Sequence, residues 1–396
     1  MPQALASMPS QVYFTDMRAR GPNDASVKKL ARLLDASGLD NVVEKGDLVA
    51  IKVHLGAPGN QRHLRPQHIR VVVEKVRELG GRPFVTDTTG ISLLNPRGDA
   101  IKVLRAAAEN GITAETVGAP VIVADGLRGF TGVPVRVDGF RLKEVEVAQA
   151  IAEADVLISL AHFKGHPRTG IGGALKNVGV GCLTKKGRAP LHLAKKPQVK
   201  PELCDGCGLC AQFCPVGAIV RTEDGRYRVD QDRCLWACGC WELCPRKAIT
   251  GWAEMHHPSN EELCVRTADA AKAVLSLFGP GKAFFINLAY DITPHCDCFP
   301  WADVPMVLDI GMLASPDPVA VDKACVDLLL RAPGLPGSAA EDVGALEPGS
   351  DKISALLDWP PFKPFRQHGG PMWRAHLEWA VRAGLGSLEY ELIEVR

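Results

Sequence analysis

Eight of the chain's 13 cysteines lie between Cys204 and Cys244, and their spacing constrains the fold of this segment more than any other feature of the sequence. The first run follows the pattern C-x2-C-x2-C-x3-C and is followed by Pro215; it consists of Cys204, Cys207, Cys210 and Cys214. Bacterial ferredoxins bind iron–sulfur clusters with this run. Gly206 and Gly208 allow the tight backbone turns that direct N–H groups at cluster sulfurs.

A second run consists of Cys234, Cys238, Cys240 and Cys244, followed by Pro245. Its first and last cysteines have the same separation as those of the first run. The second cysteine comes one place late, because Ala237 stands where the pattern requires cysteine. We therefore expect either a bulged loop, for which Gly239 supplies backbone freedom, or unusual ligation of this cluster.

The two runs together predict two 4Fe-4S clusters, because the fourth cysteine of each run lies too far along to close its own cluster. One cluster would be held by Cys204, Cys207, Cys210 and Cys244, and the other by Cys214, Cys234, Cys238 and Cys240. Zinc is an alternative, since it also binds four cysteines. Loss or remodelling of the second cluster is another, because Cys238 is displaced.

The remainder of the chain alternates strand and helix patterns. Strands are expected at residues 48–53, 82–86, 121–123, 156–160, 283–286, 306–308 and 388–395, and helices at 69–79, 100–109, 319–330 and 373–383. This alternation predicts an α/β fold, a mostly parallel sheet core flanked by helices, with a small inserted α+β ferredoxin-like domain. We expect residues 1–199 and 253–396 to form the two parts of the core and residues 200–252 the inserted iron–sulfur domain.

Composition narrows the class of protein. The net charge of +1 gives no overall field that would favour nucleic acid or a membrane surface. The N-terminus does not have the pattern of a secretory signal, and no apolar run approaches the length of a membrane-spanning helix. An odd number of cysteines does not suit a closed disulfide framework, and cluster ligation needs reduced thiols. The expectation is a soluble cytoplasmic protein.

The order of motifs resembles the domain of unknown function 362 family, in the version with an inserted two-cluster ferredoxin domain of bacterial type. The residues that carry the resemblance are IKVHLGAPGN from Ile51, RPFVTDT from Arg82, the segment His162 to Cys182, the ferredoxin cysteines, Cys296 to Cys298, and Asp309 to Asp322. The resemblance covers nearly the whole chain. It implies an α/β protein with iron–sulfur clusters and implies no particular reaction.

His162, Lys164 and His166 stand at the end of a predicted strand and enter a glycine-rich segment. Ligands of open α/β sheets bind at strand ends, so Lys164, His166 and Lys176 are candidate catalytic residues. Gly172, Gly173 and the N–H groups of the helix that follows could bind an anion. The alternative is a tight structural turn with hydrogen-bonded histidines.

Cys296 and Cys298 flank Asp297, outside the ferredoxin runs. Two thiolates one residue apart can bind a soft metal ion or take part in redox chemistry. With His162 they form a candidate additional metal site; buried inert cysteines are the alternative.

Several other side chains admit two interpretations. Asp317 is expected to cap the helix that begins near Pro318, although it, Asp309 and Asp322 could also serve in acid–base chemistry. His54 and Asp87 follow strands and could line the same cleft, which Cys182 could also reach, whereas Cys264 and Cys325 look like core residues. The basic residues Lys185, Lys186, Arg188, Lys195, Lys196 and Lys200 would form a solvated loop or a docking site for an acidic partner.

Two functions remain open. In the first, the chain is an oxidoreductase whose ferredoxin module passes electrons to a small anionic substrate in the core, and the histidine-rich segment and Cys296–Cys298 share one pocket. In the second, it is a non-catalytic electron carrier or iron–sulfur adaptor that recognises a redox partner protein. The length of the chain beyond the module favours the first.

Overall fold

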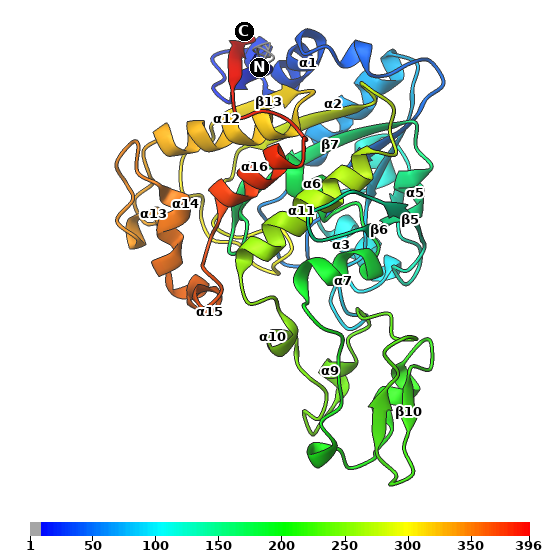
Figure 1. Cartoon of the computed structure of the whole chain (residues 1–396). Helices are drawn as coiled ribbons and strands as arrows, with labels where there is room; N and C mark the ends of the chain where they lie inside the picture. Colours follow the sequence, from blue (N-terminus) through cyan, green and yellow to red (C-terminus); the bar gives the residue numbers. More distant parts are fainter. Residues whose placement is uncertain (1–8) are drawn as a thin grey trace, which may run out of the picture.

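The computed structural model describes residues 9–396 and centres on an eight-stranded sheet in the order β14-β1-β13-β12-β7-β2-β3-β4 (Figure 1). These strands are β1 Ser10–Asp16, β2 Leu48–Lys52, β3 Arg82–Asp87, β4 Val121–Val123, β7 Val156–His162, β12 Ala283–Ala289, β13 Gly311–Ser315 and β14 Tyr390–Glu394. Strand β13 pairs antiparallel with β1 and β12, and the other neighbouring pairs are parallel. The predicted α/β fold with a mostly parallel core is therefore confirmed.

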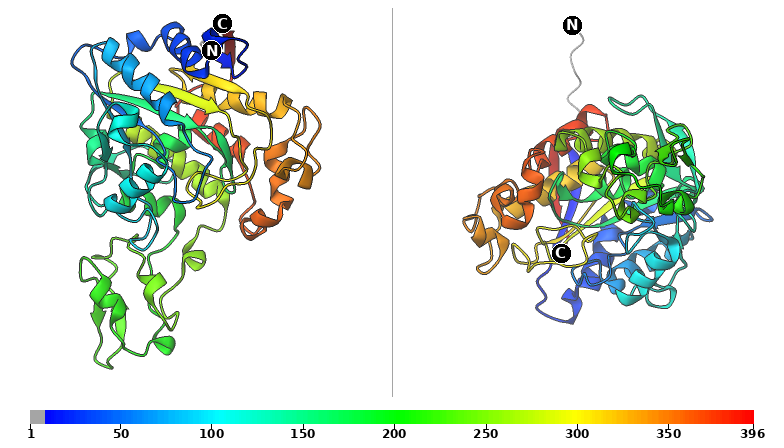
Figure 2. Two further views of the ribbon diagram at one scale, coloured as in Figure 1. Left: turned by 180° about the vertical axis from the view of Figure 1, so that it is seen from behind. Right: turned by 90° about the horizontal axis from the view of Figure 1, so that it is seen from below.

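Helices cover both faces of the sheet because its central strands are apolar on both sides. In β7, Leu157 packs into one hydrophobic core, while Ile158 and Leu160 pack into the other. One face carries α6 Ala174–Gly179, α11 Asn260–Leu275, α12 Pro318–Arg331 and α16 Trp373–Arg382, and the other carries α1 Ser26–Ala36, α2 Pro66–Glu78 and α3 Ala100–Glu109 (Figures 1 and 2).

Shorter elements complete the core. They are η1 Pro22–Asp24, η2 Leu39–Asn41, α4 Ala114–Val117, β5 Gly132–Arg136, β6 Glu144–Ala148, α5 Gln149–Ala152, β8 Lys164–His166, β9 Gly170–Gly172, α7 Lys185–His192, α13 Ala339–Asp342, α14 Lys352–Ala355, η4 Leu356–Asp358, η5 Pro360–Phe362 and α15 Lys363–Arg366. Over residues 9–396, no helix combines the length and the apolar character needed to cross a membrane.

One expected strand is wrong. Residues 306–308 form no strand; Val307 makes only an isolated bridge to Gly334. The antiparallel strand of this region is β13, in which Gly311, Ala314 and Ser315 are small and buried. Small residues lack the β-branched side chains that are typical of strands, so the sequence pattern did not predict β13.

The residues expected to form the inserted module extend from one end of the core (Figure 1, lower part). They contain η3 Pro201–Leu203, α8 Leu209–Phe213, the hairpin β10 Ile219–Arg221 and β11 Tyr227–Val229, and α9 Cys240–Leu243, followed by α10 Trp252–Met255. The two chain segments that lead into and out of the module run side by side, with antiparallel bridges Val199–Ile249 and Leu193–His256. The module has its own small hydrophobic cluster, which includes Ile219, Trp241 and Ile249.

Candidate functional site

A cavity of about 930 Å³ lies between the core and the inserted module. Its core side is formed at the ends of parallel strands, by Lys52 of β2, Asp87 of β3 and His162 of β7. Its other side is formed by the module and the segment after it, with Trp241 and Trp252 stacked at a ring-centroid distance of 6.0 Å. Loops that follow different parallel strands meet at one edge of a sheet, which is where ligands of such folds bind.

The structure brings the two predicted residue groups into this one cavity. The residues of the histidine-rich segment (His162, Lys164, His166 and Lys176) line it together with Cys296 and Cys298. His162 is the last residue of β7 rather than part of a loop, and Lys164 and His166 lie in the short strand β8.

Asp297 holds these two groups together. Its carboxylate accepts hydrogen bonds from His162 Nδ1 at 2.9 Å and Lys164 Nζ at 3.1 Å, and the carboxylate is fully buried. Burial alone would raise the pKa of Asp297, but Lys164 and His162 hold it far below its usual range. Burial disfavours the charged form of Lys164, but the neighbouring Asp297 carboxylate outweighs burial and raises the pKa of Lys164.

The geometry does not support His162 as a metal ligand. While Nδ1 contacts Asp297, Nε2 donates to the backbone oxygen of Tyr290 at 2.8 Å, so neither ring nitrogen is free. Among residues 9–396, no three or more His, Cys, Asp or Glu side chains converge in a way that would hold a single metal ion. We therefore assign His162 to positioning Asp297 and do not retain the expected additional metal site.

Cys296 and Cys298 present two thiol groups of different character. Cys296 is buried, with Lys176 Nζ 3.8 Å from its sulfur, whereas Cys298 is an exposed residue whose thiol is nevertheless surrounded by protein atoms. A hydrogen bond from Cys298, together with Lys176 and Lys164 and against the effect of burial, holds the pKa of Cys296 well below the usual value. The same hydrogen bond, burial and the Cys296 charge raise the pKa of Cys298.

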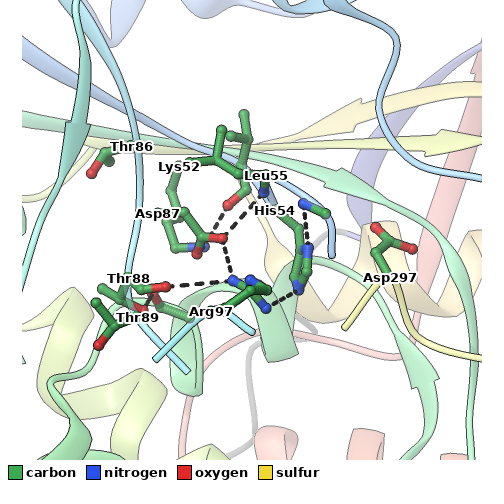
Figure 3. Close-up of polar contacts among 12 residues, drawn as sticks. Lys52, His54, Leu55, Thr86, Asp87, Thr88, Thr89, Arg97 and Asp297 are labelled. Carbon is green, nitrogen blue, oxygen red and sulfur yellow. Dashed lines mark hydrogen bonds and ion pairs between the residues drawn. The ribbon is translucent and has the colours of Figure 1, made fainter. Parts of the chain in front are cut away.

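A buried ionic network forms the adjoining wall (Figure 3). Asp87 pairs with Lys52 at 2.9 Å and Arg97 at 2.8 Å, and it accepts the N–H of Leu55 at 3.1 Å. Arg97 also contacts His54 Nε2 at 3.1 Å. Although burial opposes its ionisation, Lys52 and Arg97 hold the pKa of Asp87 far below its usual range.

The eight module cysteines line two small cavities. One is lined by Cys204, Cys207, Cys210 and Cys244, and the other by Cys214, Cys234, Cys238 and Cys240. Backbone N–H groups of Ala218 and Ala248 point at the sulfurs of Cys214 and Cys244, at 3.2 Å each. Thiols with backbone N–H groups directed at sulfur are the donor set that 4Fe-4S clusters use, so the cysteines present fit iron–sulfur ligation.

The displaced Cys238 is accommodated by a bulge. Helix α8 begins one residue before Cys210, whereas α9 begins at Cys240 itself. Trp236 and Gly239 both adopt left-handed backbone conformations, with φ of 75° and 94°. With this backbone, Cys238 lines the same cavity as the three other cysteines of its expected set.

The chain matches one known protein family over most of its length. The sequence model of the family described as domain of unknown function (DUF362) matches residues 49–327. The chain belongs to this family. This DUF362 protein is 27% identical to a thylakoid-associated protein of Synechocystis sp. over 175 residues, which are 43% of this chain and 49% of that protein.

Other relatives match shorter stretches of the chain. Over 55 residues, the DUF362 protein is 40% identical to pyruvate synthase subunit PorD of Methanocaldococcus jannaschii, covering 14% of this chain and 64% of that one. Over 66 residues it is 30% identical to a ferredoxin of Pyrobaculum islandicum, covering 17% and 62%. The chain thus spans between about half and two thirds of the length of these three relatives.

A solved structure, the lactate racemase apoprotein from Thermoanaerobacterium thermosaccharolyticum, aligns with 98% of the DUF362 chain and 83% of its own. The TM-score is 0.41 at 12% sequence identity.

The expected anion site at the glycine-rich segment is wrong. The first N–H groups of α6, those of Ala174 and Leu175, already donate to the carboxylate of Asp322, at 2.7 and 3.0 Å. Gly173 is needed because a Cβ at this position would overlap that carboxylate. Asp322 is therefore a structural cap from another helix rather than an acid–base residue of the cavity.

The basic run is not a uniform solvated loop. Lys185 and Arg188 lie in α7 and are buried, and burial lowers the pKa of Lys185 to about 7. Lys186 and Lys200 form surface ion pairs with Glu146 and Glu254. Arg188 lines the cavity of the DUF362 protein, which charge patterning alone could not reveal.

The remaining candidates take structural positions. Asp317 caps α12 by accepting the N–H groups of Val319 and Ala320, as the Asp-Pro sequence predicted. Asp309 accepts the N–H of Asp291 away from the cavity. Cys182, Cys264 and Cys325 are buried thiols. Sequence analysis missed Lys52 and Arg97; the only signal was that Lys52 ends a fully apolar strand, where a charge needs a buried partner.

Proposed function

We propose that this DUF362 protein is an iron–sulfur oxidoreductase in which the module at residues 200–252 exchanges electrons with a small anionic substrate held in the central cavity. The observation that carries this proposal is a shared wall. Trp241 lines both the central cavity and the cavity of Cys214, Cys234, Cys238 and Cys240; Ile249 lines both the central cavity and that of the other four cysteines. Trp241 and Ile249 thus lie between the central cavity and the two sets of cysteines.

The relatives support the cofactor. They are named as a ferredoxin, as PorD subunits of pyruvate synthase and as a subunit of selenate reductase, and each matches a short stretch of this chain, as expected for a shared ferredoxin-type module. By likeness we propose two 4Fe-4S clusters, which supply one-electron transfer when bound, and exchange with a redox partner protein.

The charges of the cavity support an anionic substrate. Lys164 and Lys52 are neutralised by Asp297 and Asp87. Within the described part of the chain, Lys176 and Arg188 have no carboxylate within 4.0 Å and both line the cavity. A substrate carboxylate or phosphate would balance them.

His166 adds a neutral donor to the cavity. Its Nδ1 accepts the backbone N–H of Arg168 at 3.3 Å and of Thr169 at 3.1 Å, which assigns the ring hydrogen to Nε2. Burial, with Lys176 and Arg168 nearby, holds the pKa of His166 well below its usual value, so the ring is neutral. Nε2–H can then donate to a substrate oxygen without adding charge.

A non-catalytic electron carrier or adaptor is the second candidate. It is favoured by the names of the relatives, because PorD and the selenate reductase relative are named as subunits of larger enzymes. In that case the cavity would bind no small anion.

The test begins with anaerobic purification and counting of iron and sulfide, where two clusters give about eight irons per chain. Acetate and phosphate are then added to the reduced protein, with chloride at equal ionic strength as control, and the EPR signals are recorded. An oxidoreductase with an anion site should show shifted cluster signals with one of the two probes, and Lys176→Gln should weaken the response. Zinc in place of iron would refute the iron–sulfur proposal; full iron with no response to either anion would favour the carrier.

A further inference from the structure

The central cavity is larger than the binding of a small anion requires. Its volume is about 930 Å³, which is in the range of pockets that enclose ligands of many atoms. Acetate or phosphate held by Lys176 and Arg188 would fill only a small part of it. The size of the cavity therefore favours a ligand that carries a second, larger group beside its charge.

Aromatic rings line the cavity on the side of the module. Trp241 of α9 and Trp252 of α10 are stacked, with ring centroids 6.0 Å apart and an angle of 29° between the ring planes. His192, the last residue of α7, continues the row at 6.1 Å from Trp252. All three side chains line the cavity, and so does Ile249. Such a wall favours a flat, aromatic group of the ligand, because rings contact one another with a preferred geometry.

The charged residues on the side of the module do not favour an anion. Lys200 pairs with Glu254 at 2.7 Å, and the exposed residues Glu242 and Lys247 are opposite in charge. The two cations to which the proposed function assigns the anion belong to α6 and α7 of the core. A bound anion would thus have its charge at the core and its remaining atoms at the rings.

Trp241 has an unused hydrogen-bond donor. The residue is buried, with 6% of its surface exposed, in the hydrophobic cluster of the module. The indole N–H groups of four other tryptophans donate to protein oxygens: Trp236, Trp359, Trp373 and Trp379. Among residues 9–396 the N–H of Trp241 has no acceptor, although buried indoles usually have one. Packing accounts for the burial of this ring, whereas an acceptor atom of a ligand in the cavity would satisfy its N–H.

We propose that the central cavity binds an aromatic anion, whose carboxylate or phosphate lies at Lys176 and Arg188 and whose ring lies against Trp241 and Trp252. This inference rests on the proposed function, because it names the substrate class of the same cavity. Trp241 also lines the cavity of Cys214, Cys234, Cys238 and Cys240. The ring of the ligand would therefore border these cysteines, which is the position that electron exchange with it requires.

Calorimetric titration of the iron-loaded protein under anaerobic conditions tests the proposal. The probes are benzoate and cyclohexanecarboxylate, which have the same charge and similar size, although only benzoate is aromatic. Phenyl phosphate and cyclohexyl phosphate give the same comparison for a phosphate. All titrations are made at one ionic strength, set with chloride. We expect the aromatic member of at least one pair to bind about two- to tenfold more tightly than the saturated member, because ring contacts add to the burial of apolar area.

Variants at Trp252 make the result specific, because this residue lines the central cavity and neither cavity of the module cysteines. Trp252→Leu should remove the preference for the aromatic probe, and Trp252→Phe should keep most of it. Trp379→Leu is the matched control: this tryptophan is also partly buried and lies 5.2 Å from the ring of Phe140, but it does not line the cavity. Lys176→Gln should weaken binding of both members of a pair by the same factor. Circular dichroism and the iron content show that each variant is folded and loaded.

Two results would overturn the proposal: no tighter binding of the aromatic probe in either pair, or an unchanged preference in Trp252→Leu. Failure of the proposed function is seen separately, in the iron count and in the EPR response to acetate and phosphate. An EPR response to these anions without an aromatic preference would leave the anion site standing and refute the aromatic ligand. An aromatic preference in a protein that binds no iron would leave the aromatic-anion site standing and refute the electron transfer.

Discussion

At the scale of single residues, Asp87 balances the positive charges of Lys52 and Arg97 on one wall of the cavity. Its carboxylate is almost completely buried, and its two oxygens contact Lys52 and Arg97, which come from different segments of the chain (Figure 3). Lys52 is itself buried at the end of β2, and it also donates to Asn177 at 2.9 Å. Removal of the shared carboxylate would leave two cations in the interior without their counter-ion, which is much costlier than the loss of a surface pair.

We therefore expect Asp87→Asn to lower the free energy of unfolding by about 3–5 kcal/mol. Asp35→Asn is the matched control, because Asp35 pairs with Lys75 at the exposed surface and should cost less than about 1 kcal/mol. Denaturant unfolding of both variants, loaded to the same iron content, measures the difference. Equal midpoints for the two variants would contradict a central role for Asp87.

The buried His376 side chain is expected to make the folded protein less stable in acid. It is buried on α16, and neither ring nitrogen has a hydrogen-bond partner among the described residues. Burial, and to a smaller extent Lys176, lower its pKa to about 3, against about 6.5 in the unfolded chain. Between these values the unfolded state binds more protons, so this residue's contribution to stability is complete above pH 6.5 and is lost as the pH falls.

His376→Leu should remove that loss. At pH 7 the variant should be no less stable than wild type, because no hydrogen bond is broken. At pH 5 its stability relative to wild type should improve by about 2 kcal/mol, which corresponds to 1.5 pH units below the unfolded pKa. Unfolding curves at the two pH values measure the change; a constant difference between the proteins would show that His376 does not drive acid unfolding.

At the scale of elements, the sequence predicted those structures whose signal is local. The apolar strands β2, β3 and β7 and the capped helix α12 are local signals, and so is the cysteine spacing. What could not be predicted depends on partners distant in the chain. Asp322 caps α6 from 148 positions away, and β13 is recognisable only when β1 and β12 pair with it. The common location of the histidine-rich segment and Cys296–Cys298 was predictable, because parallel strands end at one edge.

The bulged cysteine loop gives a prediction at this scale. Gly239 has φ of 94°, and an added Cβ would overlap Ser92 of the core, which the loop contacts through hydrogen bonds from Ser92 and Leu93 to the oxygens of Ala237 and Cys238. Gly239→Ala should therefore displace Cys238 and reduce iron from about eight to about four per chain. Gly251→Ala is the control, because Gly251 has an ordinary φ and no atom within 4 Å of an added Cβ. Full iron in both variants would show that the bulge is not needed.

At the scale of the whole molecule, the core sheet is continuous without the module. Chain segments from both sides of residues 200–252 pair within it, and β7 lies beside β12 although the module separates them in sequence. The chain leaves the core near Val199 and returns to it near Ile249, and these two residues form an antiparallel bridge. The module extends from the core at this point (Figure 1). This geometry is typical of a domain inserted into a loop, whose removal the host fold tolerates.

Replacement of residues 200–248 by Asn-Gly tests this architecture. Val199 and Ile249 pair antiparallel, with further hydrogen bonds from Thr250 N–H to the oxygen of Gln198 at 2.9 Å, so a two-residue turn can join them as a hairpin. The shortened protein should bind no iron yet keep the core sheet, seen as unchanged far-UV circular dichroism of the core and slow amide exchange in β7 and β12. The control is the full-length chain with Cys204→Ser and Cys234→Ser, which lacks one ligand of each expected cluster but retains the module. If the control folds and the shortened chain aggregates, the module is an integral part of the core. If both proteins fold and the amides of β7 exchange equally slowly, the core is an independent domain, and the module covers its cavity.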